Sequence, residues 1–575
     1  MKKKRKVLFV VPVLVVVVII FAIKIGGYKN PLTAKETDEN LIVLIGDGMG
    51  PAQVTLARVY GQEYMDMERL SMDNYLVGMN STRADHSPAS EESGIVTDSA
   101  ASGTAFATGN KTYNGAISVT NEDVAKPVAS ILEAAQDAGK GTGLISTTRI
   151  THATPAVYAS HVRDRDNENA IASQYVDADI DVFIGGGERH FVGSEAEAKF
   201  GETAREDGEN LIDEFAEKGY QIAHNQDELQ QADGDKLLAL LSDSHVPYNL
   251  DREEDFPSLK EQLEKAIEIL EKNDEGFVIM IEGGRIDHAG HANDIHSVVQ
   301  ELIEFDEAFE AAVQYAEESG NTSVIATADH ETGGLTIGSE DVYDAYLDVI
   351  EPITASSEKI GEELQEAQSK AEIKEIVETY TGINDLSNDE VNQIKNGKLS
   401  DGTPSSYESE GAFNDVISQR SMIGWTGHGH TGVDVGVYGY GPAAELLTGF
   451  NDNTDFAKAG ATALGLDLDK ATEALQEKYL YPPYKETADE VALFPVDTLQ
   501  EPLNFKVDKG DTDINVEGNK MSFSVGKDAN VVDIEGDQYE VLVDQDQLYV
   551  PIDLLAAVTK ENIQWDALSE RIILE

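Results

Sequence analysis

The stretch "LIVLIGDGMG", residues 41–50, is a continuous apolar run that ends in a glycine-rich turn. Such a run is typical of a strand buried on both faces, and the turn indicates a loop at its end. The same design recurs at "GTGLIST" (141–147), "DVFIGGG" (181–187), "FVIMIEGG" (277–284), "TSVIATAD" (322–329) and "VGVYGYG" (435–441). Helical patterns lie between these runs. We therefore predict an α/β fold with a large, mainly parallel sheet sandwiched between helices.

The first 30 residues differ from the rest of the chain. Five basic residues are followed by an apolar run over residues 7–23. This arrangement is typical of an export segment, which is either a signal peptide or an uncleaved membrane anchor. The length of the run and the lack of a convincing A-x-A site favour the anchor, with its N-terminus in the cytoplasm. We expect the body outside the cytoplasm, either secreted or tethered to the outer face of the cell membrane.

The remaining sequence indicates two further units. Residues 33–485 carry the alternation of strands and helices, and we expect one catalytic domain there. Within it, the polar, helix-prone region at about 336–421 predicts a helical insertion. Residues 490–575 show short strand patterns with Gly/Asp turns and one short helix. They predict a small β-rich C-terminal domain.

Charge and cysteine content exclude several classes of function. The chain has 43 basic and 107 acidic side chains, a formal net charge of −64. Such a surface repels polyanions, so we expect neither nucleic acid nor an anionic membrane surface as a partner. Cysteine is absent, which excludes disulfides, thiolate metal sites and a cysteine nucleophile. Any metal must be held by His, Asp, Glu and hydroxyl oxygen.

Acidic residues and histidines gather at the ends of the predicted strands, which is where open parallel sheets bind ligands. Asp47, Glu282 and Asp329 each lie at such an end. In "IEGGRIDHAGHAND" (281–294), Asp287 and His291 are four residues apart, and one helical turn would bring them to the same face as a metal pair. These oxygen and nitrogen donors suit zinc and magnesium and are too many for one ion. The pattern therefore predicts two or three metals.

The stretch "VTDSAASGTAFATG", residues 96–109, follows Ser99 with small side chains until Phe106. In one interpretation Ser99 is the N-cap of a helix packed tightly on the sheet. In the other it is a nucleophile at a helix N-terminus, where the dipole favours an alkoxide and an incoming anion. The two are compatible, and we expect cap and nucleophile to coincide in Ser99.

Six motifs together carry a family resemblance: "LIGDGMG", "VTDSAASGTAFATGNKTYNGAISV", "THATPAVYASHVRDR", "IEGGRIDHAGH", "TADHETGG" and "GHTGVD". In this order, from about residue 38 to 465, the chain closely resembles the alkaline phosphatases. The resemblance implies a mixed, mainly parallel sheet between helices and a metal-dependent hydrolase of small phosphate monoesters. Because members are commonly dimers, it also implies a homodimer.

The resemblance further implies roles for three residues around the phosphate. Ser99 would be the nucleophile that becomes phosphorylated. Arg165 would clamp two phosphate oxygens, and Asp98 would orient it. A planar bidentate donor suits a dianionic phosphoryl group better than a lysine does.

Three metal sites are also implied, each by a set of three residues: Asp287, His291 and His430 for one zinc ion; Asp47, Asp329 and His330 for a second zinc ion; Asp47, Thr154 and Glu282 for a magnesium ion. The first zinc would activate the leaving oxygen and later the attacking water. The second would deprotonate Ser99. Two metals roughly 4 Å apart neutralise charge on the entering and leaving oxygens of an in-line displacement.

Some positions leave a choice. Arg163 and Arg165 both lie in "HVRDR", and the spacing from "HATP" favours Arg165. His428 and His430 compete likewise, and the following "TG" favours His430. His152 and His288 stand where some bacterial members have Asp and Lys and animal-type members have His. We expect both to supply hydrogen bonds around the site rather than bind metal.

The favoured function is a phosphate monoester hydrolase that scavenges phosphate outside the cytoplasm. One alternative is a phosphodiesterase of the same superfamily, although those enzymes generally use threonine as nucleophile and lack the clamping arginine. The other is a non-catalytic surface-binding protein. The C-terminal stretch "QLYVPIDLLAAVTKENIQWDALSERIIL" weakly resembles the copper amine oxidase N-terminal-like modules of cell-surface proteins. Because it contains no histidine, we expect no copper there and interpret it as an accessory domain for surface attachment or spacing.

Overall fold

The computed structural model describes residues 38–86, 93–194, 196, 198–201, 203–534, 536–559 and 562–575. The predicted N-terminal signal or anchor, residues 1–30, lies outside these described residues. Within them, no helix combines the length and the apolar character needed to cross a membrane.

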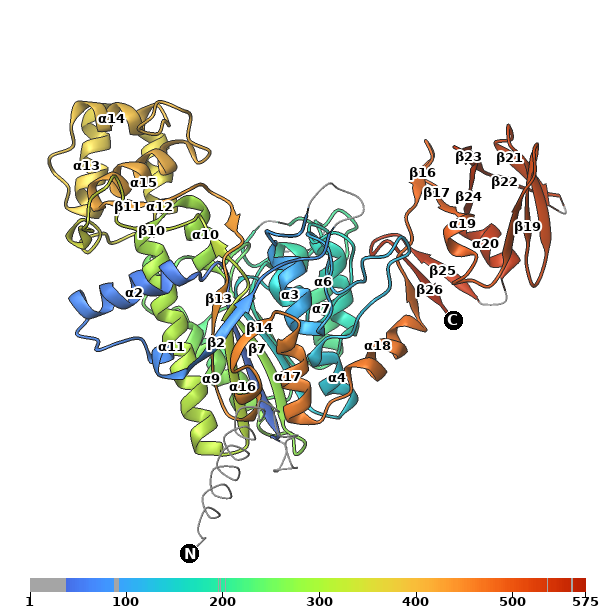
Figure 1. Cartoon of the computed structure of the whole chain (residues 1–575), viewed down its shortest axis with the longest axis horizontal. Coiled ribbons are helices and arrows are strands. Elements are labelled where there is room, and N and C mark those ends of the chain that lie inside the picture. Colours follow the sequence, from blue (N-terminus) through green and yellow to red (C-terminus); the bar gives the residue numbers. More distant parts are fainter. Residues whose placement is uncertain are drawn as a thin grey trace, which may run out of the picture. The chain divides into compact units, whose positions relative to one another are not determined.

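A ten-stranded sheet forms the centre of the described chain (Figure 1). Across the sheet the strands are β14 (Gly449–Asp452), β2 (Leu76–Ser81), β13 (Val435–Tyr440), β8 (Thr322–Ala328), β1 (Asn40–Gly46), β7 (Phe277–Gly283), β3 (Gly141–Arg149), β4 (Val182–Gly186), β6 (Leu237–Leu240) and β5 (Gln221–Ala223). Strand β13 is antiparallel to both of its neighbours, and the other pairs are parallel. The predicted mainly parallel sheet is confirmed.

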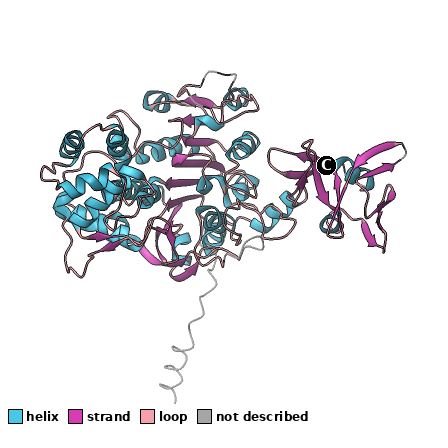
Figure 2. Ribbon diagram, turned by 90° about the horizontal axis from the view of Figure 1, so that it is seen from above, coloured by secondary structure: helices cyan, strands magenta, loops and turns pink. Residues whose placement is uncertain are grey.

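Strand β1 is apolar throughout because both faces of the sheet are buried at this strand. Its side chains alternate between two apolar clusters: Ile42 and Leu44 pack in one, and Leu41, Val43 and Ile45 in the other. The first cluster is completed by α2 (Pro51–Tyr64), α9 (Leu259–Leu270) and α11 (Ile295–Ser319). The second is completed by α3 (Ser99–Thr108), α4 (Ile131–Asp137), α6 (Glu168–Asp177), α7 (Leu211–Glu217) and α17 (Asp455–Leu464). Helices therefore cover both faces of the sheet (Figure 2).

Strand register brings the predicted site residues to one edge. Ile45 of β1 pairs with Glu282 of β7, and Gly46 pairs with Ala328 of β8. Asp47 and Asp329 are the next residues after β1 and β8. Carboxylates from three adjacent parallel strands thus meet at the C-terminal edge of the sheet.

Between β8 and β13 the chain forms a helical insertion. Its helices are α12 (Ser357–Glu366), α13 (Lys370–Thr381), α14 (Asn388–Lys395) and α15 (Glu408–Ser421). The short strands β10 (Thr336–Ile337) and β11 (Ile423–Gly424) pair antiparallel and bring the two ends of the insertion together.

The C-terminal region is rich in short strands with an apolar cluster of their own. After α18 (Leu468–Gln476) come β15 (Tyr479–Leu480), β16 (Lys485–Glu486), β17 (Ala492–Pro495), α19 (Val496–Leu499), β18 (Lys506–Lys509), β19 (Asp513–Glu517), β20 (Ser522–Gly526), β21 (Val531–Ile534), β22 (Asp537–Glu540), β23 (Leu542–Asp544), β24 (Gln547–Pro551), α20 (Ile552–Val558), β25 (Ile563–Asp566) and β26 (Arg571–Leu574). Antiparallel pairing dominates here, as in β17–β24 and β19–β20. This agrees with the predicted small β-rich region.

Candidate active site

Ser99 is the first residue of α3, and its side chain is buried. The N-cap is Asp98, whose carboxylate accepts a hydrogen bond from the backbone N–H of Ala101 at 2.9 Å. The expectation that Ser99 is itself the cap was therefore wrong. Both residue types cap helices well, but here the Asp98 carboxylate accepts from the free N–H of Ala101, and the Ser99 hydroxyl takes no part in capping. Ser99 Oγ lies 3.2 Å from Nε2 of His330.

The small residues of α3 allow a close approach to its neighbours. All ten residues of the helix are buried. A Cβ atom added to Gly103 would lie 3.1 Å from Cγ2 of Val157, next to α5 (Ala153–Ala156). Larger side chains would push the N-terminus of α3 away from the strand ends, so the small residues position Ser99.

Among the described residues, three groups of side chains offer ligand atoms within 4.8 Å of one another: Asp287, His291 and His430; Asp47, Asp329 and His330; Asp47, His152 and Glu282. The first two groups match the predicted zinc sets. The third shares Asp47 and Glu282 with the predicted magnesium set. The predicted Thr154, on α5, is buried, and its hydroxyl has no hydrogen-bond partner among the described residues.

The first group lies where α10 (Arg285–Ala292) meets β12 (His430–Thr431). One turn of α10 places Nε2 of His291 3.2 Å from Oδ2 of Asp287, and Nε2 of His430 lies 3.1 Å from the same His291 nitrogen. The Nδ1 atom of His430 donates to the backbone oxygen of Thr97 at 2.8 Å, and that of His291 donates to the oxygen of His428. These hydrogen bonds orient both rings with Nε2 toward the carboxylate, the arrangement that a metal ligand requires.

Protonation of the first group shows what a cation would replace. Burial opposes ionisation of Asp287, but His291 and the other nearby histidines hold the pKa of this carboxyl well below its usual range. Burial would lower the pKa of His291, yet Asp287 raises it to about 9. Without metal, the proton on Nε2 of His291 thus lies between the Asp287 carboxylate and Nε2 of His430. A metal ion must displace that proton, so its binding strengthens as pH rises.

The second and third groups share the carboxylate of Asp47, and Nε2 of His330 lies 3.5 Å from its Oδ1. Both oxygens of Asp47 and Oε1 of Glu282 are buried and receive no hydrogen bond from any described residue. Burial, followed by repulsion from Asp329, Asp287 and Glu282, raises the pKa of Asp47 well above its ordinary value. Burial also raises the pKa of Glu282 to about 7, although the Ser146 hydroxyl lowers it. Orphaned carboxylate oxygens at this density fit bound cations.

Arg165 contacts Asp98, the residue before Ser99, and is held from two sides. Its Nη1 donates to Oδ2 of Asp98 at 3.0 Å, and its Nη2 lies 3.0 Å from Nε2 of His152. Asp98 is fixed in turn by the backbone N–H of Gly115 at 3.0 Å. Arg163 contributes its backbone oxygen, which accepts from the Tyr113 hydroxyl at 3.3 Å.

His152 and His288 belong to a cluster with a third histidine, His245. The ring centroids of His245 and His288 are 4.3 Å apart, and His152 lies 5.6 Å from His245. Burial, and then Arg165, holds the pKa of His152 well below its usual range, so its ring is neutral and accepts from that arginine. His288 likewise accepts from Arg285 at 2.9 Å. His152 also reaches the Asp47–Glu282 group, which the sequence analysis did not expect.

Several residues that hold the candidate ligands in place were not among the predicted site residues. Ser146 and Thr148, on β3, donate to Oε2 of Glu282. His428 lies in none of the three groups found among the described residues. It contacts α10 instead, with its Nδ1 2.8 Å from the backbone oxygen of His291.

The helical insertion contacts α10 at both ends. At the start of α10, Arg285 donates to Glu358 of α12 at 2.8 Å. At its end, the backbone oxygen of Ala292 accepts from Asn414 of α15 at 2.8 Å. The same amide donates to the Ser357 hydroxyl at 2.9 Å, which joins α12 to α15. The insertion supplies no member of the three groups, but it contacts α10, which carries Asp287 and His291 of the first group.

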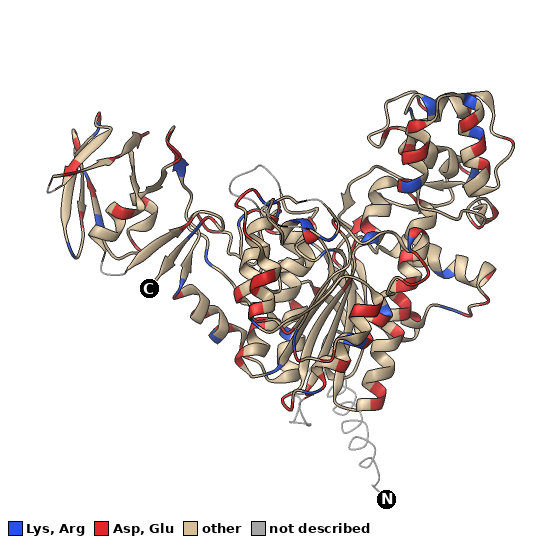
Figure 3. Ribbon diagram, turned by 180° about the vertical axis from the view of Figure 1, so that it is seen from behind, with Lys and Arg blue, Asp and Glu red and all other residues tan. Residues whose placement is uncertain are grey.

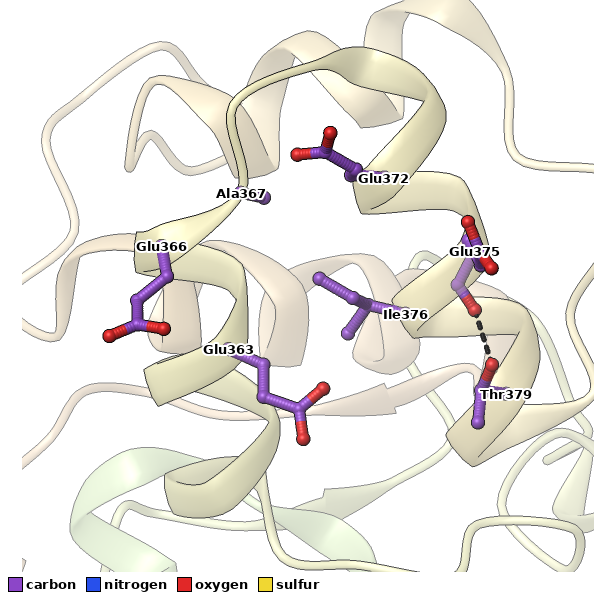
Figure 4. Close-up of a pocket in the computed structure, with 7 residues that line it drawn as sticks. All are labelled: Glu363, Glu366, Ala367, Glu372, Glu375, Ile376 and Thr379. Atoms are coloured by element: carbon purple, nitrogen blue, oxygen red, sulfur yellow. Dashed lines mark hydrogen bonds between the residues drawn. The ribbon is translucent and has the colours of Figure 1, made fainter.

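A pocket between α12 and α13, in the helical insertion, is lined mainly by acidic side chains. Figure 4 shows it lined by Glu363, Glu366, Ala367, Glu372, Glu375, Ile376 and Thr379. Acidic side chains are also spread over the helices of the chain (Figure 3). Four carboxylates repel a phosphate dianion, so this pocket is not where a phosphate ester binds.

Comparison with known proteins decides the family. The family model for alkaline phosphatase matches residues 38–466. The chain belongs to the alkaline phosphatase family. It is therefore a metal-dependent enzyme of phosphate monoester hydrolysis.

Relatives in the family cover most of this chain. Alkaline phosphatase 3 of Bacillus subtilis (strain 168) is 36% identical over 428 residues, which are 73% of this chain and 87% of that protein. The repressible alkaline phosphatase of Saccharomyces cerevisiae is 37% identical over 492 residues, 77% of this chain and 84% of that protein. The solved cold-active alkaline phosphatase of a psychrophilic Shewanella species is 36% identical, with a TM-score of 0.64 over 74% of this chain and 99% of that chain. The Thermus thermophilus enzyme is 29% identical, with a TM-score of 0.67 over 78% and 98%.

Proposed function

We propose that this alkaline phosphatase acts through a phosphoserine intermediate on Ser99, with two zinc ions and one magnesium ion. The observation that carries the proposal is the position of the Ser99 hydroxyl. It lies 3.2 Å from His330, at the N-terminus of α3, with Arg165 held beside it by Asp98. A nucleophile, an anion clamp and clustered metal-type ligands thus converge at one point.

The chain's own residues divide the work as follows. Arg165 binds the phosphoryl oxygens, and Asp98 and His152 fix its orientation. The Ser99 oxygen attacks phosphorus in line with the departing alcohol, and water later attacks the phosphoserine from the side that the alcohol has left. Metal ions would neutralise charge on the entering and leaving oxygens and would lower the pKa of a water molecule.

The donor sets support the choice of metals. Two histidines with one carboxylate (Asp287, His291, His430) and two carboxylates with one histidine (Asp47, Asp329, His330) suit zinc. Asp47, Glu282 and the Thr154 hydroxyl offer the oxygen donors that magnesium prefers. Variants of the alkaline phosphatase from the Antarctic bacterium TAB5, in which one histidine is replaced by Glu or Asp, hold magnesium in a site called M3. In our chain His152 adds a nitrogen donor to this group, which weakens its preference for magnesium.

The setting of the enzyme follows from the sequence. We propose that it works outside the cytoplasm, with the N-terminal segment as signal or membrane anchor, and scavenges phosphate from small esters. We also propose a homodimer, a catalytic domain over residues 33–485 and an accessory C-terminal domain over 490–575.

Hydrolysis of an aryl phosphate monoester and of its diester counterpart tests the function. We expect the metal-replete protein to prefer the monoester strongly, because its dianionic phosphoryl group offers three free oxygens to Arg165 and to the cations. A diester is a monoanion and offers only two. Chelation should abolish turnover, and added zinc and magnesium should restore it. A preference for the diester would contradict the proposal, as would full activity after the metals are shown to be removed.

Substitution of Arg165 tests the phosphate clamp. We expect Arg165→Ala to lower kcat/KM for a monoester about 10–100-fold, because charge-assisted hydrogen bonds to the phosphoryl group are lost. The inhibition constant of inorganic phosphate should rise by a similar factor. Arg163→Ala, two residues earlier, is the matched control and should stay within about twofold of the unchanged protein. The reverse result would assign the clamp to Arg163.

A further inference from the structure

The pocket at the mouth of the active site has an apolar wall. The pocket has a volume of about 570 Å³, and its lining includes Ile95, Val96, Asp98, Asn114, His291 and His430. Two of these, His291 and His430, belong to the first ligand group, and Asp98 precedes the nucleophile. The pocket therefore opens directly from the catalytic residues.

Contacts from other segments fix the backbone of this wall. The Asn114 amide donates to the Val96 oxygen at 3.2 Å and accepts from the Asp98 N–H at 3.1 Å. The Thr97 oxygen accepts from His430. A Cβ atom added to Gly432 would lie 3.0 Å from the Ile95 oxygen, so the loop after His430 packs closely against this residue. Residues 95–98 thus present a defined surface.

That surface exposes two branched aliphatic side chains beside a polar centre. Ile95 is 53% exposed and Val96 is 43% exposed. In the proposed mechanism the ester oxygen leaves on the side opposite Ser99, where the group formed by Asp287, His291 and His430 would receive it. The alcohol carbons beyond that oxygen then enter the pocket, where Ile95 and Val96 are the apolar side chains.

We propose that this pocket is the subsite for the alcohol portion of the substrate, and that Ile95 and Val96 make the enzyme favour esters with an apolar carbon skeleton. The inference rests on the proposed function, because it uses the placement of phosphorus between Ser99 and Arg165. Burial of substrate carbon against the two side chains supplies the preference.

A series of n-alkyl phosphates from ethyl to hexyl tests the subsite. Their alcohols have nearly equal acidity, so a change in kcat/KM along the series reports apolar contact rather than leaving-group chemistry. We expect kcat/KM to rise by up to about fourfold per methylene until the chain leaves the pocket. The double variant Ile95→Ser, Val96→Ser should flatten the rise, so that its kcat/KM for hexyl phosphate is close to its own value for ethyl phosphate. The variant should still fold, because exposed side chains contribute little to stability. Val433→Ser, at a valine 46% exposed that does not line the pocket, is the matched control.

The outcomes separate this inference from the proposed function. A rise in the unchanged protein and in Val433→Ser, but not in the double variant, supports the subsite. A flat series with monoester hydrolysis intact overturns the subsite and leaves the function standing. A rise that persists in the double variant overturns the assignment to Ile95 and Val96. Failure to hydrolyse any monoester overturns the proposed function as well. Equal melting temperatures of the variants show that each result comes from the pocket.

Discussion

Replacement of Ser99 by alanine is expected to lower kcat for an aryl phosphate by at least about 10³-fold, because the hydroxyl that forms the proposed covalent intermediate is removed. Ser99 Oγ lies at the start of α3, next to His330 and to the arginine that Asp98 holds. Alanine at the same position keeps the helix and leaves the capping contact of Asp98 intact, since the cap is the neighbouring residue. The loss should therefore fall on the chemical step and leave the fold unchanged.

The covalent intermediate gives this prediction a second readout. Acid quenching of the unchanged protein during turnover of a labelled monoester should trap phosphate on Ser99, identifiable by peptide mass. The alanine variant should trap none. Thr108→Ala, near the far end of the same helix, is the control: it removes a buried hydroxyl that bonds to the Thr104 oxygen and should lower stability but not kcat. Trapped phosphate in Ser99→Ala would move the nucleophile to another residue.

The strands that the sequence predicted are those with long, largely buried apolar runs. Strand β1 packs apolar side chains on both faces, so its apolar run is unbroken and visible. Strand β5 has three residues at one edge of the sheet, and β14 has four at the other, which is too short for a clear pattern. Strand β6 was missed as well, although all four of its residues are buried.

The missed strand explains a missed site residue. His245 follows β6 and joins His152 and His288 beside the catalytic centre. Ligands gather at the ends of strands, so only a prediction of β6 could have marked His245 as a candidate site residue. The cap at α3 failed for a different reason. Asp98 and Ser99 are both good capping residues, and the choice depends on where the chain entering the helix aims the carboxylate, which local sequence does not determine.

Asp47→Asn is expected to have opposite effects on the metal-free and metal-loaded protein. Asp47 belongs to two ligand groups, so the variant should lose metal from both and lower kcat/KM by at least about 100-fold at metal concentrations that saturate the unchanged protein. In the metal-loaded state its melting temperature should also be lower, because tightly bound ligand stabilises the fold by mass action.

Without metal the sign should reverse. Burial, and then repulsion from Asp329, Asp287 and Glu282, raises the pKa of Asp47 well above its ordinary value. Since the folded protein then binds a proton that the unfolded chain has released, the stability contribution of this carboxyl falls as pH rises above about 4. At pH 8 the raised pKa of the Asp47 carboxyl therefore costs stability that asparagine does not cost, and metal-free Asp47→Asn should melt at the same temperature as the unchanged protein or higher.

A hydrogen-bonded carboxylate provides the matched control. Asp306 is also buried, and burial raises its pKa to about 6, but its two oxygens accept from the backbone N–H groups of Ser71 and Met72. Asp306→Asn turns one of these acceptors into a donor and should lower the melting temperature equally with and without metal. If metal-free Asp47→Asn is also less stable, then Asp47 makes a favourable contact of its own. Suppose that only Asp47→Asn changes sign, with a lower melting temperature than the unchanged protein with metal and an equal or higher one without it. That result would show that Asp47 is retained for cation binding at a cost in stability.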